Sequence, residues 1–154
     1  MKAVLLVCFI FLNLMIFAQD AKTDIAKNTT SKDRKEMLEA LKKKVQPDLK
    51  MLPKLVVKHL YVKGGFAFFE GAVKNSEGKD IDWSKTVFKE ANDEGAFDGE
   101  STTALLKKTG GKWKVLTYAI GPTDLPWGCW WKEYKAPKEI FSYAEADCSW
   151  TESK

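Results

Sequence analysis

Two Gly-Gly pairs, each set between segments rich in β-branched and aromatic residues, constrain the fold of this chain more than any other feature. Such segments favour β-strands, and paired glycines supply the backbone conformations of a tight hairpin turn. The expected strand–turn–strand units are residues 55–62, Gly64-Gly65 and 66–73, then residues 102–108, Gly110-Gly111 and 112–120. The sequence therefore predicts two β-hairpins, and Gly71 within the first is a candidate position for a bulge.

A helix is expected before the first hairpin. Thr30 and Asp33 have the spacing of a capping box, and apolar residues recur at helical intervals from Met37 to Val45. We expect Pro47 to end this helix, because proline removes a backbone donor and its ring crowds the preceding turn.

The remaining segments are shorter or less regular. Residues 79–100 mix apolar side chains with many acids, and we expect a long loop holding a short strand or helical turn. A closing helix is expected over residues 127–134, with Thr123 or Asp124 as its cap. Residues 140–143 are expected to add a last short strand.

These elements predict an α+β fold. The N-terminal helix would pack on a curved antiparallel sheet of about four strands, with a short C-terminal helix, and the helices would cover one face of the sheet. Residues 31–154 are expected to form this single domain, and the polar, aperiodic residues 19–30 are expected to be a flexible lead.

The first residues have the organisation of a signal peptide. Lys2 is followed by an apolar stretch to Phe17, and small Ala18 precedes a polar segment, so cleavage is expected after residue 18. The apolar stretch is short for a membrane span, which needs about 20 residues. An uncleaved anchor helix is the alternative; otherwise the mature chain would contain no transmembrane span and would be secreted or periplasmic.

Charge and cysteine content bear on the expected partners and on a disulfide. The formal net charge is +4 at pH 7, and Arg34 is the only arginine, so nucleic acid is not an expected partner. Lysines concentrate in residues 22–58, which could orient the chain towards an anionic surface, although mixed charge on solvated faces is the ordinary explanation. Outside the signal peptide only Cys129 and Cys148 remain, and an even count in an exported chain favours a disulfide.

The order of these elements resembles the cystatin-like and nuclear-transport-factor-like roll, in which a long helix packs into a curved sheet. The runs GGFAFFEG, ALLKKTGGKWKV and IGPTDLPWGCWWKEYKAPKEIF together resemble a group of exported bacterial proteins of uncharacterised activity, over residues 33–141. The resemblance implies a periplasmic or secreted location and assigns no functional residue. The roll hosts enzymes, inhibitors and binding modules alike.

Candidates for catalysis are few. His59 is the only histidine, and strand alternation would place it on one face with Val57 and Tyr61. With Asp124 and Tyr118 it could form an acid/base site in a roll cavity. The simpler explanations, which we favour, are a hydrogen-bonded surface or half-buried imidazole at His59 and a helix cap at Asp124. No nucleophile motif, phosphate loop or dinucleotide fingerprint is present.

Acidic residues in 92–100 (NDEGAFDGE) could offer oxygen ligands to calcium, with Asp93, Asp98 and Glu100 as the candidates. Their spacing does not match the EF-hand loop. A solvated acidic loop is the simpler interpretation, so we expect no metal site and no cofactor.

An aromatic stripe is the most informative cluster. The chain has 6 tryptophans, and Trp127, Trp130, Trp131 and Tyr134 follow the i, i+3, i+4, i+7 spacing of one helix face. Such rings either bury the helix against the sheet or form a ligand platform. We expect a division between the two roles, with Trp127 and Tyr134 mostly buried and Trp130 or Trp131 partly exposed near Lys132 and Lys135.

The sequence favours a non-enzymatic exported module that binds a protein, a peptide or a cell-wall glycan. The alternatives are a small hydrolase or isomerase using His59 and Asp124, and a structural envelope protein. A pocket that joins His59, Asp124 and Tyr118 by hydrogen bonds would favour the enzyme, and absence of an exposed aromatic patch would favour the envelope protein. The sequence leaves the oligomeric state open.

Overall fold

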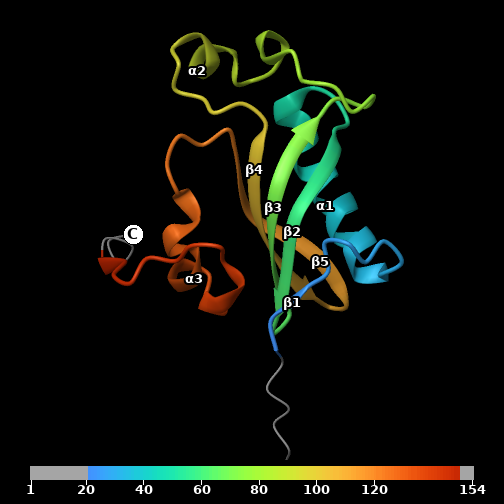
Figure 1. Cartoon of the computed structure of the whole chain (residues 1–154), viewed down its shortest axis with the longest axis vertical. Helices are drawn as coiled ribbons and strands as arrows, with labels where there is room; N and C mark the ends of the chain where they lie inside the picture. Colours follow the sequence, from blue (N-terminus) through green and yellow to red (C-terminus); the bar gives the residue numbers. More distant parts are fainter. Residues whose placement is uncertain (1–20, 150–154) are drawn as a thin grey trace, which may run out of the picture.

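Five strands and a long helix form the framework of the chain (Figure 1). The computed structural model describes residues 21–149, so the expected signal peptide of residues 1–18 lies outside the described residues. The strands are β1 (Thr23–Asp24), β2 (Lys54–Lys63), β3 (Phe66–Lys74), β4 (Ser101–Thr109) and β5 (Lys112–Ile120). The helices are α1 (Lys32–Leu49), α2 (Lys89–Asp93) and α3 (Trp130–Glu133), with 3-10 turns at Trp83–Lys85, Pro126–Cys129 and Lys138–Ile140.

The strands make one antiparallel sheet in the order β1-β2-β3-β4-β5. Both predicted hairpins are confirmed, and Gly64, Gly65, Gly110 and Gly111 all have positive φ, from 57° to 76°, which a two-residue hairpin turn requires. The sheet has five strands where about four were expected. The additional strand is β1, in which Thr23 pairs with Val62.

One face of the sheet is covered by α1. Its buried side chains are Met37, Leu41, Val45 and Leu49. They pack in one core with Leu60 of β2, Phe69 of β3, Leu106 of β4 and Trp113 of β5. This is the larger of the two apolar cores.

The opposite face is covered by the C-terminal segment, residues 121–149 (Figure 1). Trp130, Ile140 and Phe141 of this segment pack on Phe68 and Leu105. The expectation that the helices share one face is therefore wrong. β3 and β4 carry apolar side chains on both of their faces, and such strands need a cover on each side.

The ends of the helices differ from the prediction. Ser31, rather than Thr30, is the N-cap of α1, and its hydroxyl accepts the backbone N–H of Arg34 at 3.2 Å. The helix continues past Pro47, because proline removes only its own donor so near the end, and continuation buries Leu49 completely. Lys50 ends it in a left-handed conformation with φ of 54°.

The closing helix is shorter than expected. A 3-10 turn at Pro126–Cys129 precedes α3, and Leu125 is its N-cap without a side-chain hydrogen bond, so neither Thr123 nor Asp124 caps it. Residues 140–143 form no strand, because the C-terminal segment lies over the face of the sheet rather than at its edge.

The loop over residues 79–100 contains a 3-10 turn and α2, as the sequence predicted in outline. Trp83, Phe88 and Phe97 pack ring against ring, with centroids 4.7 to 6.2 Å apart. In the described part of the chain, no helix combines the length and the apolar character that crossing a membrane requires.

Candidate functional site

The aromatic stripe lies over the β3–β4 face and is only partly buried. Trp130 is 6% exposed and belongs to the second core, whereas Trp127, Trp131 and Tyr134 are half-buried at its margin. Phe68 is the neighbour beneath Trp127, with ring centroids 6.4 Å apart. We call Trp127, Trp131 and Tyr134 the aromatic surface.

Trp131 is oriented by a hydrogen bond and lies beside a cation. Its indole N–H donates to the backbone oxygen of Glu145 at 3.2 Å, which fixes the plane of the ring. The ammonium group of Lys138 lies 4.7 Å from the ring centroid. The sequence had indicated Lys132 and Lys135 as the neighbouring cations, but α3 ends at Glu133 and the chain turns, so the 3-10 turn at Lys138–Ile140 supplies the cation instead.

The predicted disulfide is confirmed and lies directly beside this surface. Cys129 and Cys148 are bonded, with their Cα atoms 5.7 Å apart and a sequence separation of 19. The backbone N–H of Glu145, inside the closed loop, donates to the carbonyl of Gly128, just before the loop, at 2.9 Å. The covalent bond therefore holds the carbonyl that orients Trp131.

His59 lies on the same side of the sheet but on the exposed part of β2. A bulge between Val57 and His59 inserts one residue into the strand, which resets the alternation of side chains. Val57 therefore packs towards α1 while Tyr61 packs towards the C-terminal segment. The expectation that His59 shares a face with Val57 is wrong for this reason, and its pairing with Tyr61 holds.

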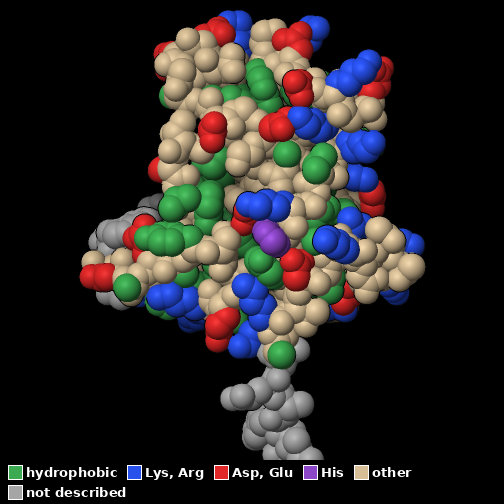
Figure 2. All heavy atoms as spheres, viewed as in Figure 1, with side chains coloured by type: hydrophobic (Ala, Val, Ile, Leu, Met, Phe, Trp, Pro, Cys, Tyr) green, Lys and Arg blue, Asp and Glu red, His purple; other side chains and the backbone are tan. Residues whose placement is uncertain are grey.

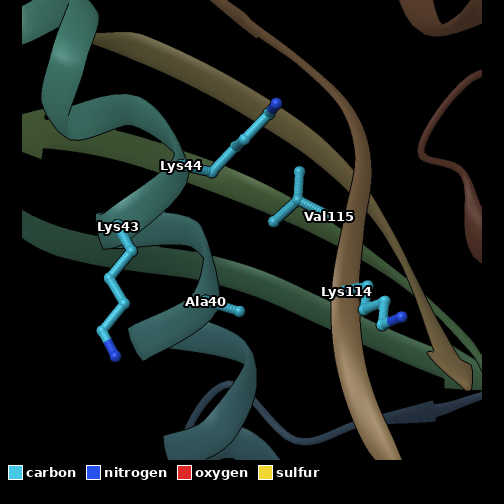
Figure 3. A pocket seen from close by; sticks show the side chains of 5 residues that line it. All are labelled: Ala40, Lys43, Lys44, Lys114 and Val115. Atoms are coloured by element: carbon cyan, nitrogen blue, oxygen red, sulfur yellow. The ribbon is translucent and has the colours of Figure 1, made fainter. Parts of the chain in front are cut away.

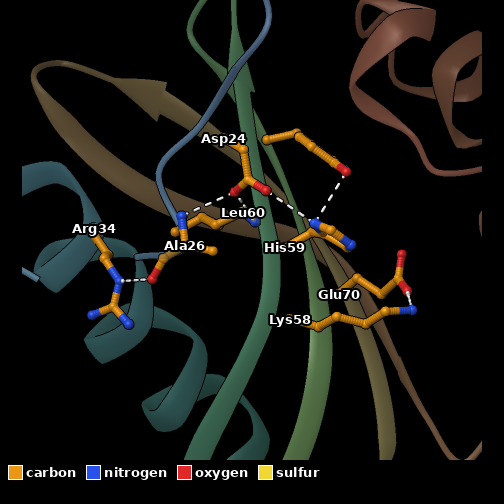
Figure 4. A network of polar contacts seen from close by, with 8 residues as sticks. Asp24, Ala26, Arg34, Lys58, His59, Leu60 and Glu70 are labelled. Atoms are coloured by element: carbon orange, nitrogen blue, oxygen red, sulfur yellow. Dashed lines mark hydrogen bonds and ion pairs between the residues drawn. The ribbon is translucent and has the colours of Figure 1, made fainter. Parts of the chain in front are cut away.

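The imidazole belongs to a polar network that fastens β1 to β2 (Figure 4). Its Nδ1 lies 2.9 Å from Asp24 and 3.1 Å from the Tyr61 hydroxyl, and the two rings stack 5.0 Å apart. Asp24 also accepts the backbone N–H groups of Ala26 and Leu60 at 3.0 and 3.1 Å. Figure 2 shows the histidine at the surface among lysine and carboxylate side chains.

Two carboxylates in this region are held in their charged form. Partial burial acts to raise the pKa of Asp24, but hydrogen bonds from His59 and from two backbone amides outweigh it, so the pKa lies below its ordinary value. Burial opposes ionisation of Glu70 as well, and the Lys58 ammonium, 2.6 Å away, holds the pKa of Glu70 below its ordinary value. The sequence did not indicate Asp24 as a site residue, because it lies in a segment for which no helix or strand was predicted.

The other two members of the proposed acid/base site lie elsewhere. The Tyr118 hydroxyl donates to Asp48 at 2.5 Å, on the side of the sheet that faces α1. Asp124 is exposed. Within residues 21–149, no hydrogen bond joins either of them to His59. His59 therefore has an orienting carboxylate, as a general base does, without the expected partners.

The acidic loop does not gather its carboxylates. Asp93 pairs with Lys89, Glu100 pairs with Lys74, and the backbone of Asp98 is bonded to Gly121. Across residues 21–149, one group of three potential metal ligands converges, formed by Cys129, Glu145 and Cys148. The disulfide already engages both of its sulfur atoms.

Comparisons with protein-family models, with curated proteins and with solved structures gave no significant match. The functional argument therefore rests on the residues of this chain.

Proposed function

We propose that this chain is a non-enzymatic exported binding module whose aromatic surface recognises a cell-wall glycan. The observation that carries the proposal is the state of Trp131, a half-buried indole whose plane is fixed by a hydrogen bond and whose ring lies 4.7 Å from a lysine ammonium. A fixed indole face stacks on a sugar ring, and the neighbouring cation would pair with a carboxylate on that sugar.

An exported location is supported by the Cys129–Cys148 bond, because disulfides persist in oxidising compartments. The n-, h- and c-region order of the first residues supports the same proposal. Mass spectrometry of the exported protein should find an N-terminus at or near Gln19. An intact Met1 end on the exported protein would contradict it.

Calorimetric titration with soluble peptidoglycan fragments tests glycan binding. Trp131→Phe retains an aromatic face and should retain most of the affinity, whereas Trp131→Leu keeps apolar volume and should weaken binding about fivefold, corresponding to about 1 kcal/mol of lost stacking. Val87→Ala removes an exposed apolar side chain on the distant loop and serves as the control. Equal affinity of Trp131→Phe and Trp131→Leu would refute the stacking role.

Lys138→Gln separates the two parts of the site. It should weaken binding of fragments that bear carboxylates and leave neutral chito-oligosaccharides unaffected, because only the cation is removed. If the protein binds an unstructured peptide and no glycan, the partner is a peptide and the glycan proposal is wrong.

The enzyme alternative has one specific observation in its favour, the Asp24–His59 pair with a 290 Å³ hollow beside it, lined also by Lys27 and Lys58. No serine, threonine or cysteine side chain among residues 21–149 is hydrogen-bonded to this imidazole. The binding proposal predicts that His59→Gln leaves glycan affinity unchanged. A loss of affinity in that variant would place the site at His59 instead.

A further inference from the structure

A second candidate site lies between α1 and β5, along the open edge of the sheet. Two hollows of about 340 and 390 Å³ adjoin there, and both are lined by Ala40 and Lys43 of α1. Lys44, Lys114 and Val115 complete the first, and Lys112 and Trp113 are among the residues of the second. We call the two hollows together the lysine groove.

The lysine groove runs along the edge of the sheet rather than across one face. Each hollow meets two consecutive residues of β5, Lys112 and Trp113 in one and Lys114 and Val115 in the other. Because consecutive strand residues point to opposite faces, hollows that meet both lie at the strand's edge. Within residues 21–149, β5 is the terminal strand and pairs only with β4, with a register shift at Leu116, beyond the groove residues. In this part of the chain its outer backbone N–H and C=O groups have no strand partner, which is the condition for adding another strand.

The two sides of this edge differ in chemistry. Trp113 and Val115 belong to the core under α1, whereas Lys112 and Lys114 alternate with them and are exposed. In Figure 3, Val115 projects towards the helix, while Lys43, Lys44 and Lys114 extend in different directions around the hollow. The cations therefore border the groove along its length and do not converge on one point.

The positive charge of the lysine groove is not neutralised within the described chain. Among residues 21–149, none of Lys43, Lys44, Lys112 and Lys114 has an ion-pair partner. The groove also contains Glu36 and Glu39, and these pair with Lys32 and Lys42 at 3.7 and 2.8 Å. Four unpaired cations beside an apolar floor favour an anionic ligand with apolar groups at regular intervals.

We propose that the lysine groove binds an acidic peptide segment in extended conformation, which pairs with the free edge of β5. Side chains of such a segment alternate between two faces. Acidic residues would face Lys112 and Lys114, and small apolar residues would lie over Val115 and Ala40, with Lys43 and Lys44 beside the peptide. A second copy of β5 is a poor occupant, because its own Lys112 and Lys114 would lie against those of the first.

The test uses the purified protein and a synthetic fluorescent peptide of 9 residues, the length of β5, in which glutamate alternates with valine or threonine. Fluorescence anisotropy at low salt gives its affinity. The double variant Lys43→Glu, Lys114→Glu should weaken binding at least about tenfold, since attraction becomes repulsion at two sites. The charge-matched control Lys27→Glu, Lys79→Glu changes two exposed lysines elsewhere and should bind within about twofold of the unchanged protein.

A second probe separates strand pairing from charge attraction. The same peptide, N-methylated at alternate residues on the edge that would face β5, keeps its charge but loses its donors. It should bind at least about tenfold more weakly, and the unmodified peptide should protect β5 amides from hydrogen exchange. Equal affinity of the two peptides, tighter binding of anionic vesicles or of polygalacturonate, or an equal loss in the control variant would each overturn the proposal. None of these outcomes depends on Trp131.

Discussion

Tyr118→Phe is the most direct test of how α1 is attached to the sheet. The Tyr118 hydroxyl of β5 donates to the carboxylate of Asp48, near the end of α1, at 2.5 Å. Burial, the hydrogen bond to Asp48 and the charge of Asp48 together raise the pKa of Tyr118 from 10.0 to about 12. The phenol is therefore stabilised in its protonated form in the folded protein.

The substitution removes one hydrogen bond to a charged group and leaves Asp48 partly exposed, so water can replace the lost donor. Hydrogen bonds to charged groups contribute about 1.5 to 3 kcal/mol, and partial exposure places this one at the lower end, about 1.5 kcal/mol. Because the folded pKa is raised, this contribution is complete below pH 10 and is lost as the pH rises from 10 towards 12. The two proteins should differ at pH 7, and the difference should shrink above pH 10 and vanish as the pH approaches 12.

Urea unfolding, followed by tryptophan fluorescence, measures the loss of unfolding free energy at pH 7 and its change with pH. At pH 7 the variant should lose about 1.5 kcal/mol, which corresponds to a fall in Tm of about 5 °C for a domain of this size. Tyr143→Phe is the matched control, since Tyr143 is 47% exposed. A loss below about 0.3 kcal/mol at pH 7, or a difference that stays constant up to pH 11, would refute the reasoning.

Three further outcomes are expected. Gly71→Ala should cost at least about 3 kcal/mol in urea unfolding, because a Cβ there would lie 2.1 Å from the backbone oxygen of Val56, and a cost near 1 kcal/mol would show that the strands can separate. Replacing Cys129 and Cys148 by serine should cost about 3 kcal/mol on the chain-entropy model for a sequence separation of 19, and an unchanged urea midpoint would contradict this. Asp24→Asn should speed hydrogen exchange at β1. Because the pKa of Asp24 is lowered, the exchange rates of the variant and the unchanged protein should converge as the pH falls below 3.8. A difference that persists in acid would exclude a charge effect.

The framework was predictable because its signals are local. Gly-Gly turns between β-rich segments specify hairpins without reference to the rest of the chain. The double cover of the sheet had a signal too, since residues 66–69 (FAFF) are continuously apolar and all four are buried. β1 had no sequence signal, because two residues form no pattern. Asp24 holds this strand through hydrogen bonds to His59 and Leu60, which exist only after folding.

The candidate site was predictable in composition but not in geometry. Helical spacing indicated one stripe of four rings on a continuous helix, yet the segment is a 3-10 turn at Pro126–Cys129 followed by a helix of four residues. Trp130 enters the core, whereas Trp127 stays at the margin. The cation beside Trp131 comes from Lys138, whose position depends on the chain reversal after α3.

The two edges of the sheet explain why the lysine groove could not be seen in the sequence and why it matters. The β2 edge is protected by structure: β1 pairs with part of it and a bulge interrupts the rest at Lys58. The β5 edge has a register irregularity too, because Leu105 pairs with Thr117 and Leu106 with Val115, which leaves Leu116 as the extra residue. The stretch from Lys112 to Val115 pairs regularly and is protected by charge instead, through lysines that sequence analysis attributes to solvated faces. Strand pairing and bulges hinder any added strand, whereas charge hinders only strands of the same sign. The edge guarded by Lys112 and Lys114 is therefore the one that an acidic strand can still reach.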